Sequence, residues 1–106
     1  MTDRPHPRTV EILSRLVAFD TTSRNSNLAL IDYAQSVLEA CGARTERTYD
    51  ESGGKANLWA TIGPQDRAGI VLSGHTDTVP VDGQAWTSDP FELVERDGRF
   101  FGRGTC

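Results

Sequence analysis

The chain has few of the residues that build membrane spans or secretory leaders. Its longest run of isoleucine, valine and leucine is three residues, at 70–72, whereas a membrane-spanning helix needs about 20 apolar residues. The first seven residues also lack the apolar core of a secretory signal. We therefore expect a cytoplasmic protein that has no membrane partner.

Cysteine and histidine are equally scarce, with two of each in 106 residues. Cys41 and Cys106 lie far apart and outside any Cys-x-x-Cys spacing, which argues against a disulfide framework or a thiolate zinc site. Cys106 has no base beside it in the sequence, so for this residue a structural role is favoured over a nucleophilic one. We expect two reduced thiols.

An excess of basic charge is also missing. Fifteen acidic residues against eleven basic ones give a net charge of -4, which offers no electrostatic footprint for nucleic acid or an anionic membrane. The remaining composition, 37% hydrophobic and 25% charged, is ordinary for a globular protein. About 100 residues suit one small domain with no nucleic-acid partner.

Two stretches have the apolar spacing of amphipathic helices. The first is expected from a capping residue, Thr9, to about Phe19. The second is expected over residues 27–40, followed by Gly42 in position to form a left-handed C-cap. Each helix should pack its apolar face on a sheet.

Strands are expected at residues 44–49, 57–62 and 70–73, and the last of these should be buried on both faces at the centre of the sheet. Farther on, Asp97-Gly98 is a signal for a type I′ hairpin, here between residues 91–96 and 99–102.

The hairpin register pairs Val94 with Phe101 and places Arg96 opposite Arg99. Together with the helices, these strands indicate an α/β fold.

His75 and Asp77 directly follow the most apolar run. In extended backbone, side chains at i and i+2 lie on the same side, so Asp77 can accept a hydrogen bond from Nδ1 of His75 and leave Nε2 free for a divalent ion. The end of a strand is where open α/β sheets bind ligands. Alternatively, His75 is a hydrogen-bonded strand-end residue and Asp77 caps the next turn. The other histidine, His6, lies between prolines without an evident partner.

Three motifs in this order and at these intervals carry a family resemblance: residues 75–80 (His-Thr-Asp-Thr-Val-Pro), 86–91 (Trp-Thr-Ser-Asp-Pro-Phe) and 102–106 (Gly-Arg-Gly-Thr-Cys). They resemble the N-terminal part of the M20 family of zinc-dependent amidohydrolases and peptidases. Residues 23–28 and 55–58 resemble the deacetylase branch of that family.

The resemblance implies the N-terminal part of a zinc-aminopeptidase-like, three-layer α/β/α catalytic domain with a central mixed sheet. It makes His75 a ligand of the first metal and Asp77 the catalytic-site carboxylate that orients it. In the family pattern, the aspartate that bridges two metals would directly follow Cys106, and the other ligands and the general-base glutamate lie farther along. Residues 1–106 are therefore expected to be an incomplete domain, without the inserted dimerisation domain of a homodimer.

The resemblance also implies a chemistry. It indicates hydrolysis of a small N-acyl amino acid with one or two Zn²⁺ ions, or Co²⁺, in which the metal lowers the pKa of bound water toward about 7. The deacetylase branch implies removal of the acetyl group from N2-acetyl-L-ornithine, giving ornithine and acetate, in arginine biosynthesis. The alternatives are a succinyl-diaminopimelate desuccinylase, an M20 carboxypeptidase, a fragment that is inactive by itself, or a binding module that reuses the fold.

Several residues near the motifs have two readings. Trp86 and Phe91 could line a substrate pocket, but large aromatics beside a turn favour packing. Gly102 and Gly104 either permit a close backbone approach to the metal ligand that would follow them or merely end a strand. Arg103 between them is expected to be a structural ion-pair donor rather than a substrate clamp.

Overall fold

The first helix begins at a histidine cap rather than at a threonine. The computed structural model describes residues 4–106, and its first element is α1 (Pro7–Ala18). Nδ1 of His6 accepts a hydrogen bond of 3.1 Å from the backbone N–H of Arg8. Proline is favourable in the first helical turn because a backbone N–H at that position would have no acceptor within the helix. The expectation that Thr9 caps this helix is therefore wrong, and His6 has a structural role.

The second helix ends as the sequence predicts. α2 (Leu28–Ala40) is followed by Gly42, which has φ +86° and donates its backbone N–H to the carbonyl of Glu39 at 2.9 Å. This confirms the left-handed C-cap. At the other end, Asn27 occupies the N-cap position, but its side chain makes no capping hydrogen bond.

The structure contains two separate antiparallel sheets of two strands each. β1 (Arg44–Tyr49) pairs with β2 (Ala56–Thr61), and the register places Arg44 opposite Thr61. Both strands were expected, and β2 begins one residue earlier than predicted. α2 packs on this sheet, which confirms the expected helix-on-sheet packing for one of the two helices.

The second sheet is the predicted hairpin. β3 (Val94–Arg96) and β4 (Arg99–Phe101) pair Val94 with Phe101 and Arg96 with Arg99, as expected, although β3 begins three residues later than predicted. Asp97 and Gly98 both have positive φ, 50° and 73°, as a type I′ turn requires. The guanidinium of Arg96 lies 4.5 Å from the ring centroid of Phe101, which gives the charge of Arg96 a partner beside Arg99.

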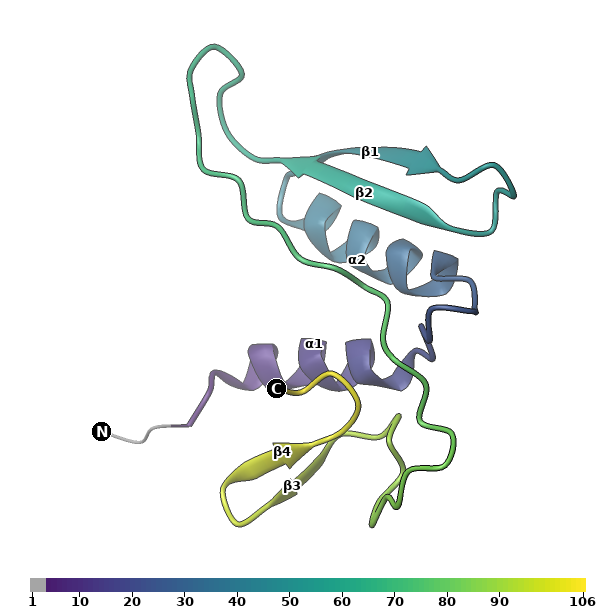
Figure 1. The fold of residues 1–106 in the computed structure, drawn as a ribbon. Coiled ribbons are helices and arrows are strands. Elements are labelled where there is room, and N and C mark those ends of the chain that lie inside the picture. Colours follow the sequence, from purple (N-terminus) through teal and green to yellow (C-terminus); the bar gives the residue numbers. More distant parts are fainter. Residues whose placement is uncertain (1–3) are drawn as a thin grey trace.

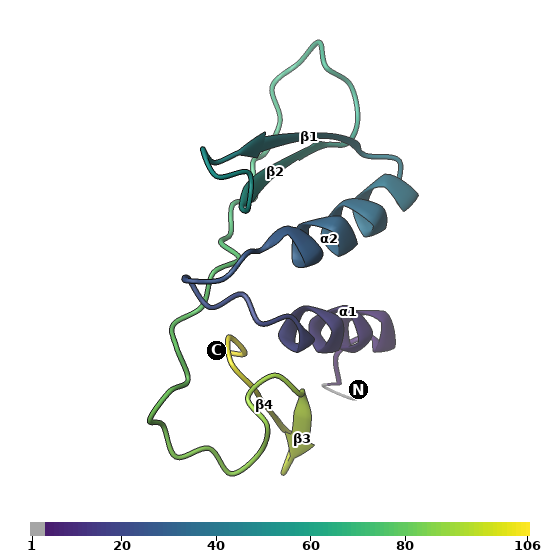
Figure 2. The ribbon, with the colours of Figure 1, turned by 90° about the vertical axis from the view of Figure 1, so that its right-hand side faces the viewer.

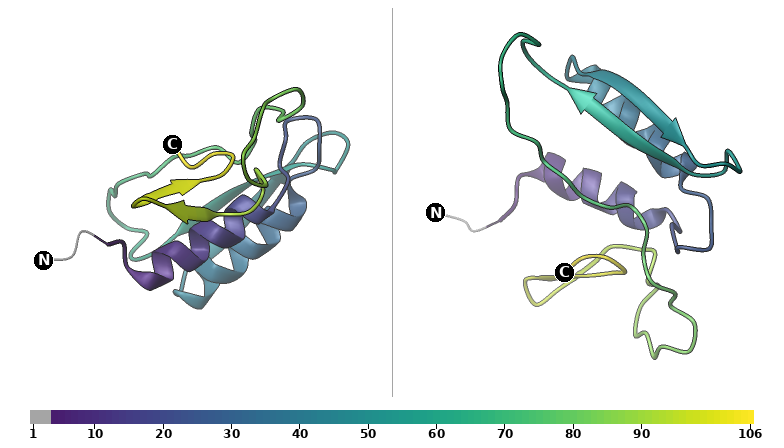
Figure 3. Two further views of the ribbon diagram at one scale, coloured as in Figure 1. Left: turned by 90° about the horizontal axis from the view of Figure 1, so that it is seen from below. Right: turned by 45° about the horizontal axis from the view of Figure 1, so that its top comes forward.

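The elements lie in the order β1 and β2, α2, α1, then β3 and β4 (Figure 1). The view turned by 90° shows the two helices running next to each other between the two sheets (Figure 2). Phe19, the C-cap of α1, lies against Tyr33 of α2, and their ring centroids are 5.9 Å apart. In the view from below, α1 and α2 again run side by side (Figure 3). The buried apolar side chains are Val17, Leu30, Ile31 and Ala56.

The expected central strand at residues 70–73 is not formed. The segment is extended but unpaired, and Ile70 and Leu72 are 92% and 93% exposed. Within residues 4–106 no strand lies along either edge of this segment, so its backbone has no ladder to join and its side chains have no layer to pack against. The chain is mixed α/β with two small antiparallel sheets, and the central mixed sheet of a three-layer fold is not seen in the described residues. No helix in this part of the chain is long and apolar enough to cross a membrane.

Candidate metal centre

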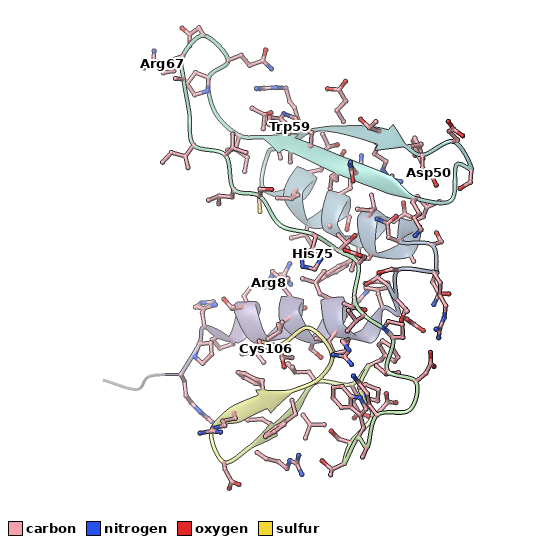
Figure 4. All side chains as sticks on the ribbon, in the orientation of Figure 1. Arg8, Asp50, Trp59, Arg67, His75 and Cys106 are labelled. Carbon is pink, nitrogen blue, oxygen red and sulfur yellow. The ribbon has the colours of Figure 1, made fainter. Side chains whose placement is uncertain are left out.

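The predicted contact between His75 and Asp77 is present. Nδ1 of His75 lies 2.9 Å from Oδ1 of Asp77 and also 2.9 Å from its backbone carbonyl oxygen. The carbonyl oxygen and the ionised carboxylate are both acceptors, so Nδ1 carries a proton, and in the neutral imidazole the lone pair is on Nε2. Figure 4 shows His75 on the segment that runs past α2 and α1, and its side chain is 82% exposed.

The segment that carries His75 is attached to the loop that follows α1. Thr22 and Thr78 form a parallel β-bridge, in which the N–H of Thr78 donates to the carbonyl of Thr21 and the N–H of Ser23 donates to the carbonyl of Thr78, each at 3.0 Å. The hydroxyl of Thr21 donates to the carbonyl of Thr76 at 2.6 Å. The extended backbone that brings His75 and Asp77 to one side is therefore stabilised by pairing with a loop about 55 residues earlier in the chain.

Asp77 has a second partner. The hydroxyl of Ser23 donates to Oδ2 of Asp77 at 2.8 Å. The pKa of Asp77 is lowered from its ordinary value, chiefly by this hydroxyl and next by the hydrogen bond from His75. At neutral pH the carboxyl is therefore ionised and serves as an acceptor for the imidazole.

Asn27 connects three parts of the structure near this pair. Its amide nitrogen donates to the carbonyl of Ala56 at 2.9 Å and to the hydroxyl of Thr76 at 3.0 Å, while its amide oxygen accepts from the N–H of Ala56 at 3.0 Å. The start of α2, the start of β2 and the His75 segment are thus held together by one side chain. Sequence reasoning missed both Ser23 and Asn27 as supporting residues, although both lie in the stretch that resembles the deacetylase branch.

Two hollows meet at His75. The larger, of about 790 Å³, lies between α2, β2 and residues 73–77. The smaller, of about 210 Å³, is lined on the other side by Phe19, Phe91 and Arg103 among others. A free Nε2 beside two hollows has room for a metal and for groups bound to it.

Among the described residues, His75 is suited to be one ligand of a metal, but these residues do not supply the further ligands that a complete site needs. An imidazole whose second nitrogen is hydrogen-bonded to a carboxylate is the usual pattern for a metal-binding histidine. Protein zinc sites use three or four protein ligands, and within residues 4–106 no three His, Cys, Asp or Glu side chains converge. Cys41 and Cys106 are free, exposed thiols.

The neighbouring motif residues are used for packing. The guanidinium of Arg103 stacks over Trp86 at 5.2 Å, and its Nη2 donates to the side-chain oxygen of Gln84. Within residues 4–106, Arg103 packs against Trp86 and forms no ion pair, so the expected ion pair stays a prediction. A Cβ at Gly102 would lie 3.0 Å from Cγ1 of Val17, so this glycine lets the chain pack closely against α1. A close approach to the metal ligand that would follow the motif stays a prediction.

Comparisons with known proteins agree with the motifs. Residues 71–106 match the model of peptidase family M20/M25/M40. The chain is 50% identical over 99 residues to an acetylornithine deacetylase of Myxococcus xanthus, an alignment that covers 89% of this chain and 26% of that protein. It is 41% identical over 107 residues to an acetylornithine deacetylase of Proteus mirabilis (94% of this chain, 27% of that protein) and 42% identical over 107 residues to one of Pasteurella multocida (94% and 28%).

This chain therefore spans about a quarter of the length of the curated relatives it matches. The matched family segment begins at the apolar run and includes both His75 and Asp77. The resemblance drawn from the three motifs is confirmed, because residues 71–106 match the model of peptidase family M20/M25/M40 and most of the chain is similar to acetylornithine deacetylases.

Proposed function

We propose that this chain is the N-terminal part of a metal-dependent amide hydrolase that removes the acetyl group from N2-acetyl-L-ornithine, giving ornithine and acetate. One observation carries the proposal: the oriented imidazole of His75 lies inside the segment that matches the peptidase family. The acetylornithine substrate is supported by the name of the relatives that align with about nine tenths of this chain.

In this proposal, His75 binds the metal through Nε2, and Asp77 keeps the proton on Nδ1 and the ring in place. The bound metal, zinc or cobalt, as one ion or a pair, supplies polarisation of the amide carbonyl and a lower pKa for a bound water. The remaining ligands and the general base come from residues outside the described part of the chain. The hollows beside His75 leave space for these groups and for the N-acyl amino acid.

The proposal extends to the whole enzyme. The relatives are longer than this chain, and we propose that the complete protein has the three-layer α/β/α catalytic domain, in which further strands cover Ile70 and Leu72. It would be a cytoplasmic homodimer that acts in arginine biosynthesis. The exposed apolar segment supports the proposal that further strands cover it, because a contiguous exposed apolar surface usually marks an interface.

The test is turnover by the complete gene product of acetylornithine, measured as acetate release, and of succinyl-diaminopimelate, measured as succinate release. We expect acetylornithine to be the better substrate and His75→Ala to lower kcat/KM by about 100-fold or more, since a ligand should matter at least as much as its supporting groups. His6→Ala is the matched control, because His6 caps α1 and should leave turnover nearly unchanged. Full turnover by His75→Ala would contradict the metal role, and a preference for the succinyl compound would contradict the substrate.

A further inference from the structure

Ser23 lies outside the motifs that mark the metal centre, yet it contacts the side chain that orients His75. It follows α1 by a few residues and is 54 positions before Asp77 in the sequence. Its hydroxyl lies 2.8 Å from Oδ2 of Asp77 and 3.2 Å from the carbonyl oxygen of Thr78. The Asp77 carboxylate is thus bound at both oxygens, Oδ1 by the imidazole and Oδ2 by the serine.

The position of Ser23 is itself fixed by the backbone on both sides. Its N–H donates to the carbonyl of Thr78 at 3.0 Å, and its carbonyl accepts a hydrogen bond from the ammonium group of Lys55. The preceding residue, Thr22, is 2% exposed. The serine hydroxyl is therefore presented to Asp77 from a loop whose backbone is hydrogen-bonded at both the N–H and the carbonyl of Ser23.

We propose that Ser23 is a positioning residue for His75, acting through Asp77. A carboxylate held at one oxygen can rotate about its χ2 torsion, which is a soft torsion for aspartate. The second hydrogen bond, from Ser23, fixes the plane of the carboxylate so that Oδ1 stays on the Nδ1–H of His75. Nε2 is then the nitrogen that keeps its lone pair. The benefit to metal binding depends on the proposed function, whereas the effect on the imidazole does not.

The alternative for His75 is a mixture of tautomers. Its side chain and that of Asp77 are 82% and 60% exposed, so water competes for every hydrogen bond of the pair. Without the serine hydroxyl, the carboxylate would turn toward solvent, and the Nδ1–H would keep only the backbone carbonyl of Asp77 as an acceptor. Part of the proton population would then move to Nε2. A fraction of the molecules would then present an N–H, instead of a lone pair, to the metal.

The experiment reads the His75 tautomer by 15N NMR in the metal-free complete gene product, at a pH where the imidazole is neutral. We expect the Nδ1–H form to predominate in the wild type and a mixture of both forms in Ser23→Ala. Ser23→Thr keeps a hydroxyl at an exposed position and should restore the wild-type tautomer. Ser26→Ala is the matched control, because the hydroxyl of Ser26 contacts only the backbone N–H of Leu28 within the described residues.

Zinc affinity of the same four proteins is the second readout. Groups that contact a metal ligand directly affect metal affinity by about 10-fold or more. Ser23 contacts the ligand His75 only through Asp77, so we expect the Kd for zinc of Ser23→Ala to rise by less, roughly three- to tenfold. Ser23→Thr should return the Kd to the wild-type value. An unchanged tautomer in Ser23→Ala, or an equal change in Ser26→Ala, would overturn the inference. A changed tautomer in a protein that binds no zinc would support the inference and contradict the proposed function.

Discussion

At the scale of single residues, Thr22 and Asp20 determine how the chain leaves α1. Oδ1 of Asp20 accepts from the hydroxyl of Thr22 at 2.6 Å and from its backbone N–H at 3.1 Å. These two hydrogen bonds, the hydroxyl first, lower the pKa of Asp20 from its ordinary value of 3.8. The turn brings the buried Thr22 alongside Thr78, and so it places the loop that supports the candidate metal centre.

Thr22→Val tests this turn. The valine keeps the shape and the backbone N–H but lacks the hydroxyl, so the pKa of Asp20 should rise toward 3.8. A carbon-detected NMR titration of the Asp20 carboxyl measures it. Thr21→Val is the control, because the hydroxyl of Thr21 donates to Thr76 instead and the pKa of Asp20 should stay as it is.

The same contact makes stability depend on pH in a defined direction. Because the pKa of Asp20 is lower in the folded state, its contribution to the free energy of unfolding is complete above pH 3.8 and is lost as the pH falls through the folded pKa. Thr22→Val should therefore lose less stability than the wild type over that acid range. An equal loss of stability in both proteins would contradict this role of Asp20.

At the scale of elements, Asn27 joins α2, β2 and the His75 segment. Asn27→Asp keeps the size of the side chain and an acceptor for the N–H of Ala56, but it places a carboxylate oxygen against the carbonyl oxygen of Ala56. We expect the free energy of unfolding to fall by about 1–3 kcal/mol, the cost of leaving a buried acceptor without its donor. Urea denaturation measures the change.

Asn57→Asp is the matched control for Asn27→Asp. Asn57 lies in β2 one residue from Ala56, is exposed, and makes no side-chain hydrogen bond to any residue in 4–106. The same change of asparagine to aspartate should therefore alter the free energy of unfolding by less than about 0.5 kcal/mol. Equal effects at the two positions would show that Asn27 does not connect the elements.

The turn after α2 gives a second prediction for an element. Gly42 has φ +86°, and a Cβ there would meet nothing within 4 Å, so Gly42→Ala should cost about 1–2 kcal/mol from backbone strain alone. Gly69 is equally open to a Cβ but does not have a left-handed φ. Gly69→Ala should therefore be neutral, or stabilising by about 0.4–1 kcal/mol through the unfolded chain. Equal losses in the two variants, measured by urea denaturation, would contradict the strain argument.

At the scale of the whole molecule, residues 4–106 are extended and thinly packed. The radius of gyration is 15.9 Å, against about 13 Å for a compact chain of 100 residues. The extents of 48, 46 and 20 Å describe a flat object, and Ile70, Val71 and Leu72 form a contiguous exposed apolar run. A surface of this kind favours association.

We therefore expect the 106-residue chain to associate in solution. Replacing Ile70 and Leu72 together by lysine should shift it toward monomer, because the apolar run is broken by two like charges. Sedimentation velocity over a range of concentrations measures the shift. Ile62→Lys is the control, since Ile62 is 64% exposed but lies outside the run. If the unsubstituted 106-residue chain were monomeric at every concentration, the prediction would be contradicted.

Predictions from the sequence succeeded where the cause is local. The C-cap at Gly42, the type I′ turn at Asp97-Gly98 and the hairpin register all depend on backbone preferences of neighbouring residues. The contact between His75 and Asp77 is of the same kind, because the two side chains are two residues apart in extended backbone. The helix start at His6 was missed because a proline at the first position outweighed the threonine cap.

The tertiary structure decided the features that depend on residues far apart in the chain. An apolar run such as Ile70-Val71-Leu72 becomes a buried strand only when other strands lie beside it, and residues 4–106 contain none there. Likewise, no pattern in the sequence predicts that Ser23 and Asn27 form hydrogen bonds with the His75 segment, about 50 residues later in the chain. Local sequence dictates turns, caps and neighbouring contacts because their energies arise within a few residues, whereas burial and the support of His75 arise from whichever distant segments pack beside it.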